Sequence, residues 1–337
     1  MGNLNYTIVT LASHSALQIL KGAKDEGFRT LLIAKNNATS FYNQFSFIDE
    51  IISVSTFAQF PTLEKKLKSK NVIIVPHGSF VADLGIEVNK KMKLSYFGNK
   101  AVLDWEADRQ MQRKWLQKAN INIPKLFGNI DEISYPVIVK SYGAAGGRGY
   151  FYAKNRHDFK NKMKSFRSSE FIIQEYVIGV TLYTHYFYSA LTNSLEIMSI
   201  DRRYETNVDS LGRIPLRGQE SLIIEPSYVV VGNSPLILRE SLLPEAFAMG
   251  ERTIAASKKL IDKKGLIGPF CLETVVTSDL VFYAMELSCR IVAGTNLFIN
   301  GSPYAWLNYN VPMSTGRRIA REVKMAIAKN MLAKIID

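Results

Sequence analysis

The first 100 residues alternate between apolar strand-like runs and helix-like segments, and this alternation restricts the possible folds more than any other feature of the sequence. Strands separated by helices are typical of a parallel sheet with right-handed crossovers. Ligands of such a sheet bind at the carboxyl ends of its strands. The expected strands are Tyr6–Leu11, Thr30–Ala34, Glu50–Val54 and Asn71–Val75, and the expected helices are Ala16–Glu26 and Leu63–Leu67.

The sequence changes character after a helix expected at Ala101–Ala119, because strand patterns dominate from Tyr135 onward. We therefore expect an N-terminal α/β domain at residues 1–100 and a second domain at 101–337. The expected strands of the second domain are Tyr135–Lys140, Tyr150–Ala153, Phe171–Val177, Leu182–Tyr188, Leu195–Asp201, Pro269–Val276 and Val281–Ser288, and its long helix is expected at Leu238–Ile261.

The composition is that of a folded protein, since 47% of the 337 residues are hydrophobic and 21% are charged. No apolar run approaches the roughly 20 residues of a membrane-spanning helix, and the N-terminus lacks a signal-peptide pattern. We therefore expect a cytoplasmic protein without a membrane partner. The formal net charge of +12 favours anionic ligands. Because the basic residues form no clustered stripe, phosphorylated metabolites are favoured over nucleic acid.

A glycine-rich loop between two expected strands is the sharpest local motif. It begins after Lys140 and contains Gly143, Gly146, Gly147, Arg148 and Gly149. Closely spaced glycines let backbone N–H groups converge on a phosphate, and two flanking cations add charged hydrogen bonds. A strand follows the loop, so the motif is neither a P-loop nor a dinucleotide fingerprint. The alternative is a flexible hairpin turn.

Two carboxylates lie in apolar strands that are close in sequence, Glu273 and Glu286. If these strands form a hairpin, both acids face one pocket, and one or two carboxylates with phosphate oxygens are the usual ligands of nucleotide-bound magnesium. Ser288 and Arg290 alternate on the face of Glu286 and would complete the site. The alternative is one acid in a salt bridge and one exposed acid.

Two further loops follow strands of the first domain and offer imidazoles, hydroxyls and backbone N–H groups. One contains Ser13, His14 and Ser15, and the other contains His77, Gly78 and Ser79. Such groups at the carboxyl edge of a sheet suit a phosphate or another polar ligand. The remaining histidines are expected to be structural: His157 is expected at the surface, and His185 in a core strand.

Weaker signals come from two segments of the second domain. Gln174, Glu175, Tyr176 and Val177 are placed to offer backbone groups to an adenine edge, although any edge strand has the same pattern. The segment Asp201–Asp209 is dense in charged groups and is either a binding site for an anionic substrate or a solvated loop.

Taken together, the motifs resemble those of the archaeal PurP family of ATP-grasp enzymes. The resemblance covers almost the whole chain. It is carried by Ser13-His-Ser, Val75-Pro-His-Gly-Ser-Phe, Tyr96-Phe-Gly-Asn, Gly146-Gly-Arg-Gly-Tyr-Phe, Asp201-Arg-Arg-Tyr-Glu, Arg239-Glu-Ser-Leu-Leu-Pro, Ile267-Gly-Pro-Phe-Cys-Leu, Gly294-Thr-Asn and Arg318-Ile-Ala-Arg-Glu. It implies an α/β (α+β) ATP-grasp fold whose second domain divides into subdomains at 101–190 and 191–337.

The resemblance also implies an activity, which is the formation of formyl-AICAR from formate, ATP and AICAR (5-aminoimidazole-4-carboxamide ribotide) in purine biosynthesis. Formate is first phosphorylated to formyl phosphate, and a homo-oligomer is expected. The implied residues are as follows: for the ribotide His14, Ser15, His77, Gly78, Ser79, Asn233, Thr295 and Asn296; for ATP Lys140, Gly143, Gly146, Gly147, Gly149, Gln174, Glu175, Tyr176, Val177 and Glu205; for Mg²⁺ or Mn²⁺ Glu273 and Glu286; and for catalysis Lys140, Arg148 and Arg290.

The chain departs from the family pattern at two places. Tyr142-Gly-Ala-Ala stands where the family has Pro-Gly-Ala-Arg, and Arg290-Ile-Val-Ala where it has Arg-Val-Asp-Gly. The first change removes a cation and the second a carboxylate near the expected acceptor site. Two alternatives therefore stay open, namely a diverged ligase for another acid and amine, and a non-catalytic protein that binds nucleotide or RNA.

Overall fold

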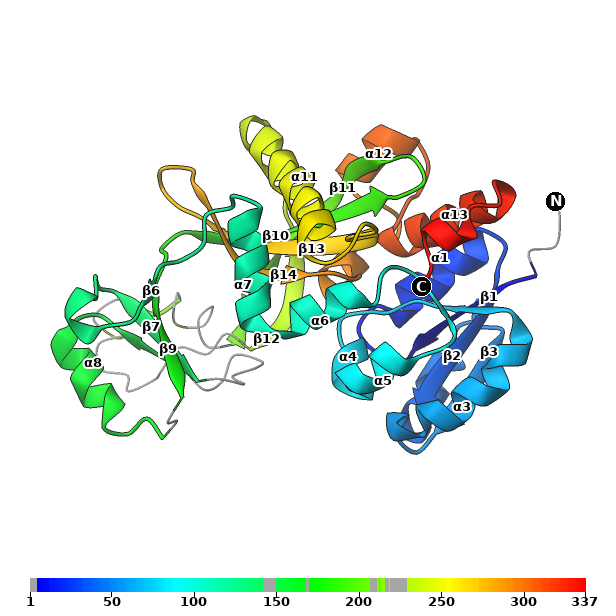
Figure 1. Ribbon diagram of the computed structural model, residues 1–337, viewed down its shortest axis with the longest axis horizontal. Coiled ribbons are helices and arrows are strands. Elements are labelled where there is room, and N and C mark those ends of the chain that lie inside the picture. The colour runs from blue at the N-terminus through cyan, green and yellow to red at the C-terminus, as the bar shows by residue number, and fades with distance from the viewer. Residues whose placement is uncertain are drawn as a thin grey trace.

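The protein consists of three β-sheets arranged along its longest axis (Figure 1). The sheet formed by the N-terminal strands lies at one end, a large antiparallel sheet lies in the middle, and a small antiparallel sheet lies at the other end. The computed structural model describes residues 5–141, 150–167, 170–206, 211, 213–215, 218 and 229–337.

The first sheet is entirely parallel, with strand order β3-β2-β1-β4-β5. This arrangement confirms the fold expected from the alternating sequence. Its strands are β1 (Thr7–Leu11), β2 (Arg29–Lys35), β3 (Glu50–Val54), β4 (Val72–Ile74) and β5 (Ser95–Tyr96), and its helices are α1 (Ala16–Asp25), α2 (Thr39–Tyr42), α3 (Phe60–Leu67), α4 (Phe80–Leu84) and α5 (Ile86–Lys91).

The prediction of a single helix at Ala101–Ala119 is wrong, because the structure contains two helices there, α6 (Ala101–Ala107) and α7 (Arg109–Lys118). Asp108 separates them. Its backbone is extended, with φ −100° and ψ 115°, and its carboxylate accepts hydrogen bonds from the backbone N–H groups of Gln110 and Met111. An aspartate in this position caps a new helix, so apolar periodicity alone did not reveal the break.

The middle sheet is antiparallel, with strand order β12-β11-β10-β13-β14. The long helix begins five residues later than expected, since a 3-10 turn precedes it and Pro244 occupies its first turn. The elements are β10 (Val180–Ser189), β11 (Ser194–Glu205), β12 (Val230–Pro235), α11 (Leu243–Leu260), β13 (Gly268–Val276), β14 (Phe282–Ser288), α12 (Pro303–Tyr309) and α13 (Thr315–Ala328).

The small sheet has strand order β6-β9-β7-β8, and helix α8 (Arg156–Met163) covers it by packing Phe159 against Phe151. Its strands are β6 (Leu126–Phe127), β7 (Val137–Ser141), β8 (Tyr150–Ala153) and β9 (Phe171–Glu175). Within the described part of the chain, no helix has both the length and the apolar character needed to span a bilayer.

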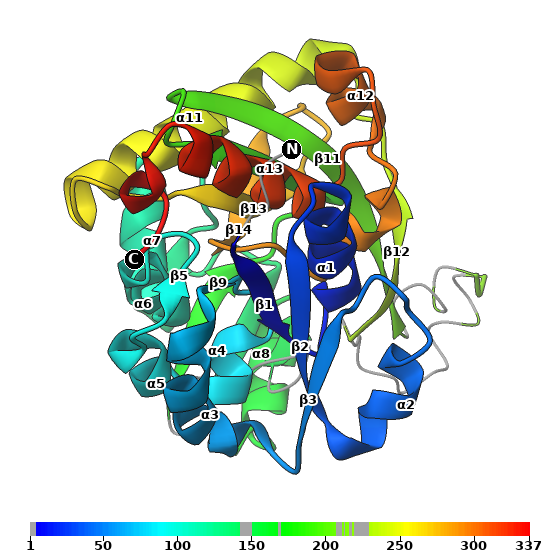
Figure 2. The ribbon, with the colours of Figure 1, turned by 90° about the vertical axis from the view of Figure 1, so that its right-hand side faces the viewer.

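The end of the chain returns to the first sheet, where α13 crosses α1 (Figure 2). Two glycines allow the close approach of these helices. A Cβ atom on Gly22 would lie 2.2 Å from the backbone N of Arg317, and one on Gly316 would lie 2.3 Å from the carbonyl O of Gln18. These separations are far below van der Waals contact, so only glycine fits at either position.

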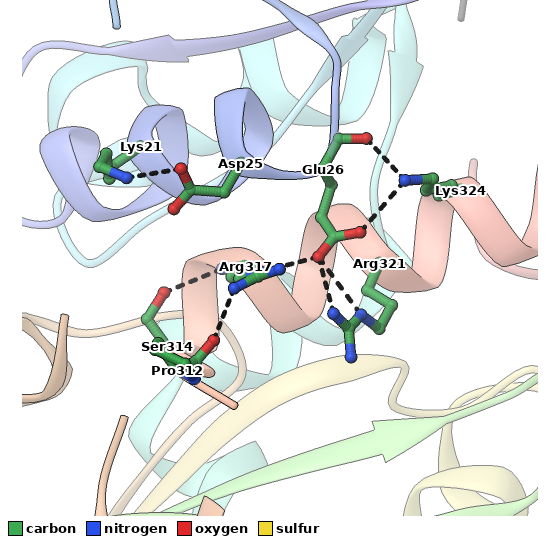
Figure 3. A network of polar contacts seen from close by, with 8 residues as sticks. All are labelled: Lys21, Asp25, Glu26, Pro312, Ser314, Arg317, Arg321 and Lys324. Carbon is green, nitrogen blue, oxygen red and sulfur yellow. Dashed lines mark hydrogen bonds and ion pairs between the residues drawn. The ribbon is translucent and has the colours of Figure 1, made fainter. Parts of the chain in front are cut away.

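The crossing is reinforced by an ion-pair network around Glu26, at the end of α1 (Figure 3). Its carboxylate accepts hydrogen bonds from Arg317 Nε at 2.7 Å and Arg321 Nη2 at 2.9 Å, and Lys324 Nζ lies 3.4 Å away. Glu26 is buried. Burial alone would raise its pKa, but the hydrogen bonds and charges of Arg317 and Arg321 outweigh burial and lower the pKa.

We expect Glu26→Gln to lower the free energy of unfolding by about 1–3 kcal/mol, because the substitution removes the negative charge and replaces one of the two acceptor oxygens by a donor that faces cations. The deficit should be present above the ordinary pKa of glutamate. It should vanish as the pH falls through the lowered folded-state pKa, where the wild-type carboxylate is protonated as well. Denaturant unfolding across this pH range measures it.

Asp25→Asn is the matched control, since Asp25 lies beside Glu26 and forms an exposed i,i+4 pair with Lys21 at 2.5 Å. Exposed pairs contribute about 0–1 kcal/mol, so this variant should remain close to wild type. Equal losses in both variants would contradict a special role for the Glu26 network.

Candidate active site

A cavity of about 680 Å³ lies between the small sheet and the middle sheet. Its volume falls in the range of roughly 300–1,000 Å³ typical of ligand sites. The residues that line it include Glu106, Arg109, Gln112, Lys140, Gln174, Glu175, Tyr176, Val177, Glu205, Glu273 and Glu286. The cavity therefore brings together residues from both antiparallel sheets and from helices α6 and α7.

The two expected metal ligands are directly opposite each other on the β13–β14 hairpin, where Glu273 pairs in register with Glu286. Both line the cavity. Burial and the negative charge of Glu286 raise the pKa of Glu273 to about 7, against the lowering effect of Arg203. Glu273 also forms an ion pair with Arg203 at 3.8 Å, and Glu286 is exposed, so features of the salt-bridge alternative are present too.

The cation expected at the phosphates, Lys140, reaches the same cavity from β7 of the opposite sheet. Burial lowers its pKa, while the negative charges of Glu273 and Glu286 raise it. An ammonium group facing two carboxylates across a cavity suits a metal-bound polyphosphate, because the anion interacts with the lysine and the metal neutralises the acids.

The segment Gln174–Val177, at the end of β9, also lines the cavity, but part of its backbone is already hydrogen-bonded. The N–H of Glu175 donates to the carbonyl of Lys125 at 2.9 Å, and the N–H of Tyr176 donates to that of Pro136 at 3.1 Å. The Glu175 carboxylate accepts from the Lys125 N–H at 3.0 Å. An adenine contact at this segment would therefore use carbonyl groups or Val177 rather than these two N–H groups.

The histidine loops of the first sheet lie side by side, as expected from their positions at the strand ends. The rings of His14 and His77 are stacked, with centroids 6.2 Å apart. A Cβ atom on Gly78 would lie 3.0 Å from His14 Cδ2, so glycine leaves room for that ring. His14 itself has a positive φ of 34°, a conformation that is uncommon outside glycine.

The two histidines differ in exposure. His77 is fully buried, its Nε2 lies 3.0 Å from the carbonyl O of Leu11, and burial lowers its pKa to about 3. It is therefore a neutral support for the loop. Ser79 Oγ donates to the Asp83 carboxylate at 2.8 Å and lies 2.8 Å from Ser13 Oγ. Ser15 is buried, and its hydroxyl has no hydrogen-bond partner among the described residues.

The turn after β14, a 3-10 segment at Ala293–Phe298, joins this loop region to the middle sheet. Asn296 donates from Nδ2 to the carbonyl O of His14 at 2.6 Å. Thr295 is buried, and its hydroxyl donates to the carbonyl O of Val292 at 2.7 Å. Asn233, on β12, donates to Asp201 at 2.6 Å.

Val292 itself packs in a small buried cluster with Tyr183 and Cys271. The departure from the family pattern at this position is therefore an apolar core contact. At the other departure, Ala145 lies outside the described residues, as do the loop residues Gly143, Gly146, Gly147, Arg148 and Gly149. Of the remaining histidines, His157 is exposed, and His185 is buried and hydrogen-bonded to Asp201.

Arg290 does not line the large cavity and lies between it and the histidine loops. Its guanidinium contacts the Glu106 carboxylate at 2.6 Å, and the same carboxylate accepts from the Cys289 N–H at 2.7 Å. The pKa of His14 is lowered first by burial and then by the charge of Arg290. The sequence analysis did not identify Glu106 and Arg109 as site residues, although both lie within the helix that it expected at Ala101–Ala119.

Two family models match the chain, one described as a protein of unknown function (DUF1246) over residues 8–127 and one as a domain of unknown function (DUF1297) over residues 151–337. A curated protein of Pyrococcus horikoshii, 5-formaminoimidazole-4-carboxamide-1-(beta)-D-ribofuranosyl 5'-monophosphate synthetase, is 53% identical over 98% of this chain and 99% of the relative. The crystal structure of an IMP biosynthesis protein PurP from Thermococcus kodakaraensis is 32% identical, with a TM-score of 0.79 over 98% of this chain and 100% of that chain.

The chain belongs to the PurP family. The resemblance inferred from its motifs is confirmed, and this PurP chain is an enzyme of the ATP-dependent ligase class. The ADP complex of PurK, an N5-carboxyaminoimidazole ribonucleotide synthetase, is 13% identical, with a TM-score of 0.69 over 94% of this chain and 76% of that chain. That likeness concerns the fold alone, and it confirms the predicted ATP-grasp architecture.

If Glu273 is the metal ligand expected from the sequence, binding of a divalent cation should depend on pH, because only the deprotonated carboxylate coordinates a metal and the pKa of Glu273 is raised to about 7. We expect affinity for Mn²⁺ to fall by up to about tenfold per pH unit below that value, with proton release on binding. Calorimetry in two buffers of different ionisation enthalpy measures both quantities.

Glu286→Gln is the informative comparison, since it removes the second expected ligand and also the charge that, after burial, raises the pKa of Glu273. Affinity should drop, and the remaining pH dependence should move to lower pH. A wild-type affinity that stays constant from about pH 8 to about pH 6 would exclude Glu273 as a ligand.

Proposed function

We propose that this PurP protein is a cytoplasmic, ATP- and formate-dependent ligase that converts AICAR to formyl-AICAR in purine biosynthesis, with Mg²⁺ or Mn²⁺ bound by Glu273 and Glu286. The observation that carries this proposal is the meeting of Lys140, Glu273 and Glu286 in one cavity. The family of the chain supports the choice of substrates, since its curated relative carries the name of the formyl-AICAR synthetase.

In the proposed reaction, an oxygen of formate attacks the γ-phosphorus of ATP and forms formyl phosphate, while ADP leaves with the electrons of the broken P–O bond. The amine of AICAR then attacks the formyl carbon and phosphate departs, with one proton lost from the amine. A bound metal would neutralise charge on the phosphates. Lys140 stabilises the charge that develops on the transferred phosphoryl group.

Three features support separate sites for the two steps. The nucleotide groups lie in the cavity between the antiparallel sheets, and the ribotide groups lie at the loops of the first sheet, with His14 at their centre. Asn296, in the turn after β14, joins the His14 loop to the middle sheet through the His14 carbonyl. Arg290 lies between them and is held by Glu106, a position suited to an anionic intermediate that passes from one step to the next.

The proposal also includes the domain boundaries and the oligomeric state. We assign residues 1–100 to the N-terminal domain and 101–337 to the ATP-grasp domain, with subdomains at 101–190 and 191–337. The family resemblance further suggests a homo-oligomer, which light scattering at several protein concentrations would test.

Incubation with formate, ATP, Mg²⁺ and AICAR is expected to yield formyl-AICAR and one ADP for each product molecule. Mass spectrometry detects the product, and a coupled assay detects ADP. Omission of formate or AICAR should abolish formyl-AICAR. If ATP is consumed only with another acid or amine, the chain is a diverged ligase, and if no substrate gives ADP, it is a nucleotide-binding protein without this activity.

Lys140→Met should lower kcat by about 100- to 1,000-fold, the usual effect of removing one preorganised charge from a phosphoryl-transfer site. Methionine keeps the length and apolar stem of the side chain. The control is Lys154→Met, because Lys154 is exposed and directly follows β8 of the same small sheet. Similar kinetics for both variants would remove Lys140 from the mechanism.

A further inference from the structure

One face of the middle sheet carries an unbroken transverse row of polar residues. Glu286 pairs in register with Glu273, Glu273 with Tyr183, and Tyr183 with Asp201. Side chains directly opposite each other on neighbouring strands lie on the same face of a sheet. The row therefore runs from the two acids of the nucleotide cavity toward Asp201, and Asn233 is hydrogen-bonded to its far end.

Arg203 lies over this row, although no signal in the sequence distinguished it from Arg202. It follows Asp201 by two residues on β11, so both side chains are on the same face. Its guanidinium stacks on the ring of Tyr183 with 3.6 Å between the guanidinium carbon and the ring centroid. One of its nitrogens lies 3.8 Å from a carboxylate oxygen of Glu273.

These contacts leave the hydrogen-bonding capacity of Arg203 unused. A guanidinium has five N–H donors. Its side chain is only 25% exposed, and among the described residues no acceptor lies within hydrogen-bonding distance of it, the Glu273 contact being longer. Buried polar groups nearly always have partners, so a largely buried guanidinium with none indicates a missing anionic ligand.

The position of Arg203 identifies which ligand this is. It contacts Glu273 on the nucleotide side, and its charge, together with that of Arg290, lowers the pKa of His14 on the ribotide side after the larger effect of burial. Arg203 and Arg290 therefore flank the space between the two proposed sites. The anion that must occupy this space is the acid that is phosphorylated and then transferred.

We propose that Arg203 and Arg290 form the subsite for the acid substrate, and that Arg203 holds the carboxylate of formate while it is phosphorylated. This inference rests on the function proposed above. The planar fork of an arginine matches the two oxygens of a carboxylate. Stacking on Tyr183 fixes the plane of the fork, so little side-chain freedom is lost when the acid binds.

The chemistry of the step places one requirement on this subsite. One formate oxygen attacks the γ-phosphorus, the bond from that phosphorus to the β–γ bridging oxygen breaks, and its electron pair leaves on ADP. No proton moves. Since formate and the γ-phosphate are both anions, they approach each other only if cations offset their repulsion, and Arg203 supplies one such charge on the formate side.

Positional isotope exchange tests the acid subsite without the amine. Reversible formation of formyl phosphate scrambles ¹⁸O between the β–γ bridge and the β non-bridging positions of ATP, which ³¹P NMR detects. We expect Arg203→Met to raise the formate concentration for half-maximal exchange by about 10- to 100-fold, with Arg203→Lys between this variant and wild type. The KM values for ATP and AICAR should remain unchanged.

Arg202→Met is the matched control, because Arg202 is the neighbouring residue on β11 and is exposed. Tyr183 offers a second comparison. Tyr183→Phe and Tyr183→Leu both remove the hydroxyl group, but only leucine removes the stacking face. If stacking preorganises Arg203, the formate requirement should rise further in the leucine variant than in the phenylalanine variant. A cooperative thermal melt without ligand verifies that each variant is folded, and the shift of that melt on adding MgATP reports nucleotide binding separately.

Three results would overturn the proposal. In the first, Arg203→Met raises the KM for AICAR and leaves the formate requirement unchanged, so the guanidinium binds the ribotide phosphate. In the second, the variant loses stabilisation by MgATP, so Arg203 serves the nucleotide. In the third, wild type neither makes formyl-AICAR nor shows formate-dependent exchange, and then the proposed function fails together with the subsite.

Discussion

The structure of the site depends on the placement of two like charges opposite each other. Glu273 and Glu286 are paired across a hairpin in a partly buried cavity, an arrangement that costs free energy unless a cation lies between them. Burial and repulsion raise the pKa of Glu273 to about 7, which is the physical sign of that cost. Lys140 approaches from the opposite sheet but does not remove the shift, so the pair is prepared for a ligand that carries its own positive charge.

A second structural constraint lies outside the large cavity, at the crossing of helices α1 and α13. The α1–α13 crossing, with Gly22 and Gly316 at its closest point and Glu26 at one end, attaches the last helix of the chain to the first sheet. That attachment holds the histidine loops against the turn that contains Asn296. The α1–α13 crossing therefore joins the first and last helices of the chain beside the sheet edge that carries the histidine loops.

Much of the fold was predictable because its signals are local. Alternating apolar runs indicated the parallel sheet, and the strands of the β13–β14 hairpin were expected within one residue of their observed bounds. The break at Asp108 was missed, because a capping carboxylate inside a continuous helical pattern resembles an ordinary polar residue. Glu106 and Arg203 were missed for a related reason, since their importance comes from partners more than 60 residues away in the chain, Arg290 and Glu273.

The sequence by itself determined the family, the parallel sheet, most strands of the second domain and the identity of most groups at the site, because residue type, spacing and periodicity are properties of short segments. Only the tertiary structure decided which of those groups face one another. It turned His77 into a buried support, tied Arg290 to Glu106, and left Arg203 stacked and without a hydrogen-bond acceptor among the described residues. Burial and distance act between strands and domains, and no pattern within a single segment records them.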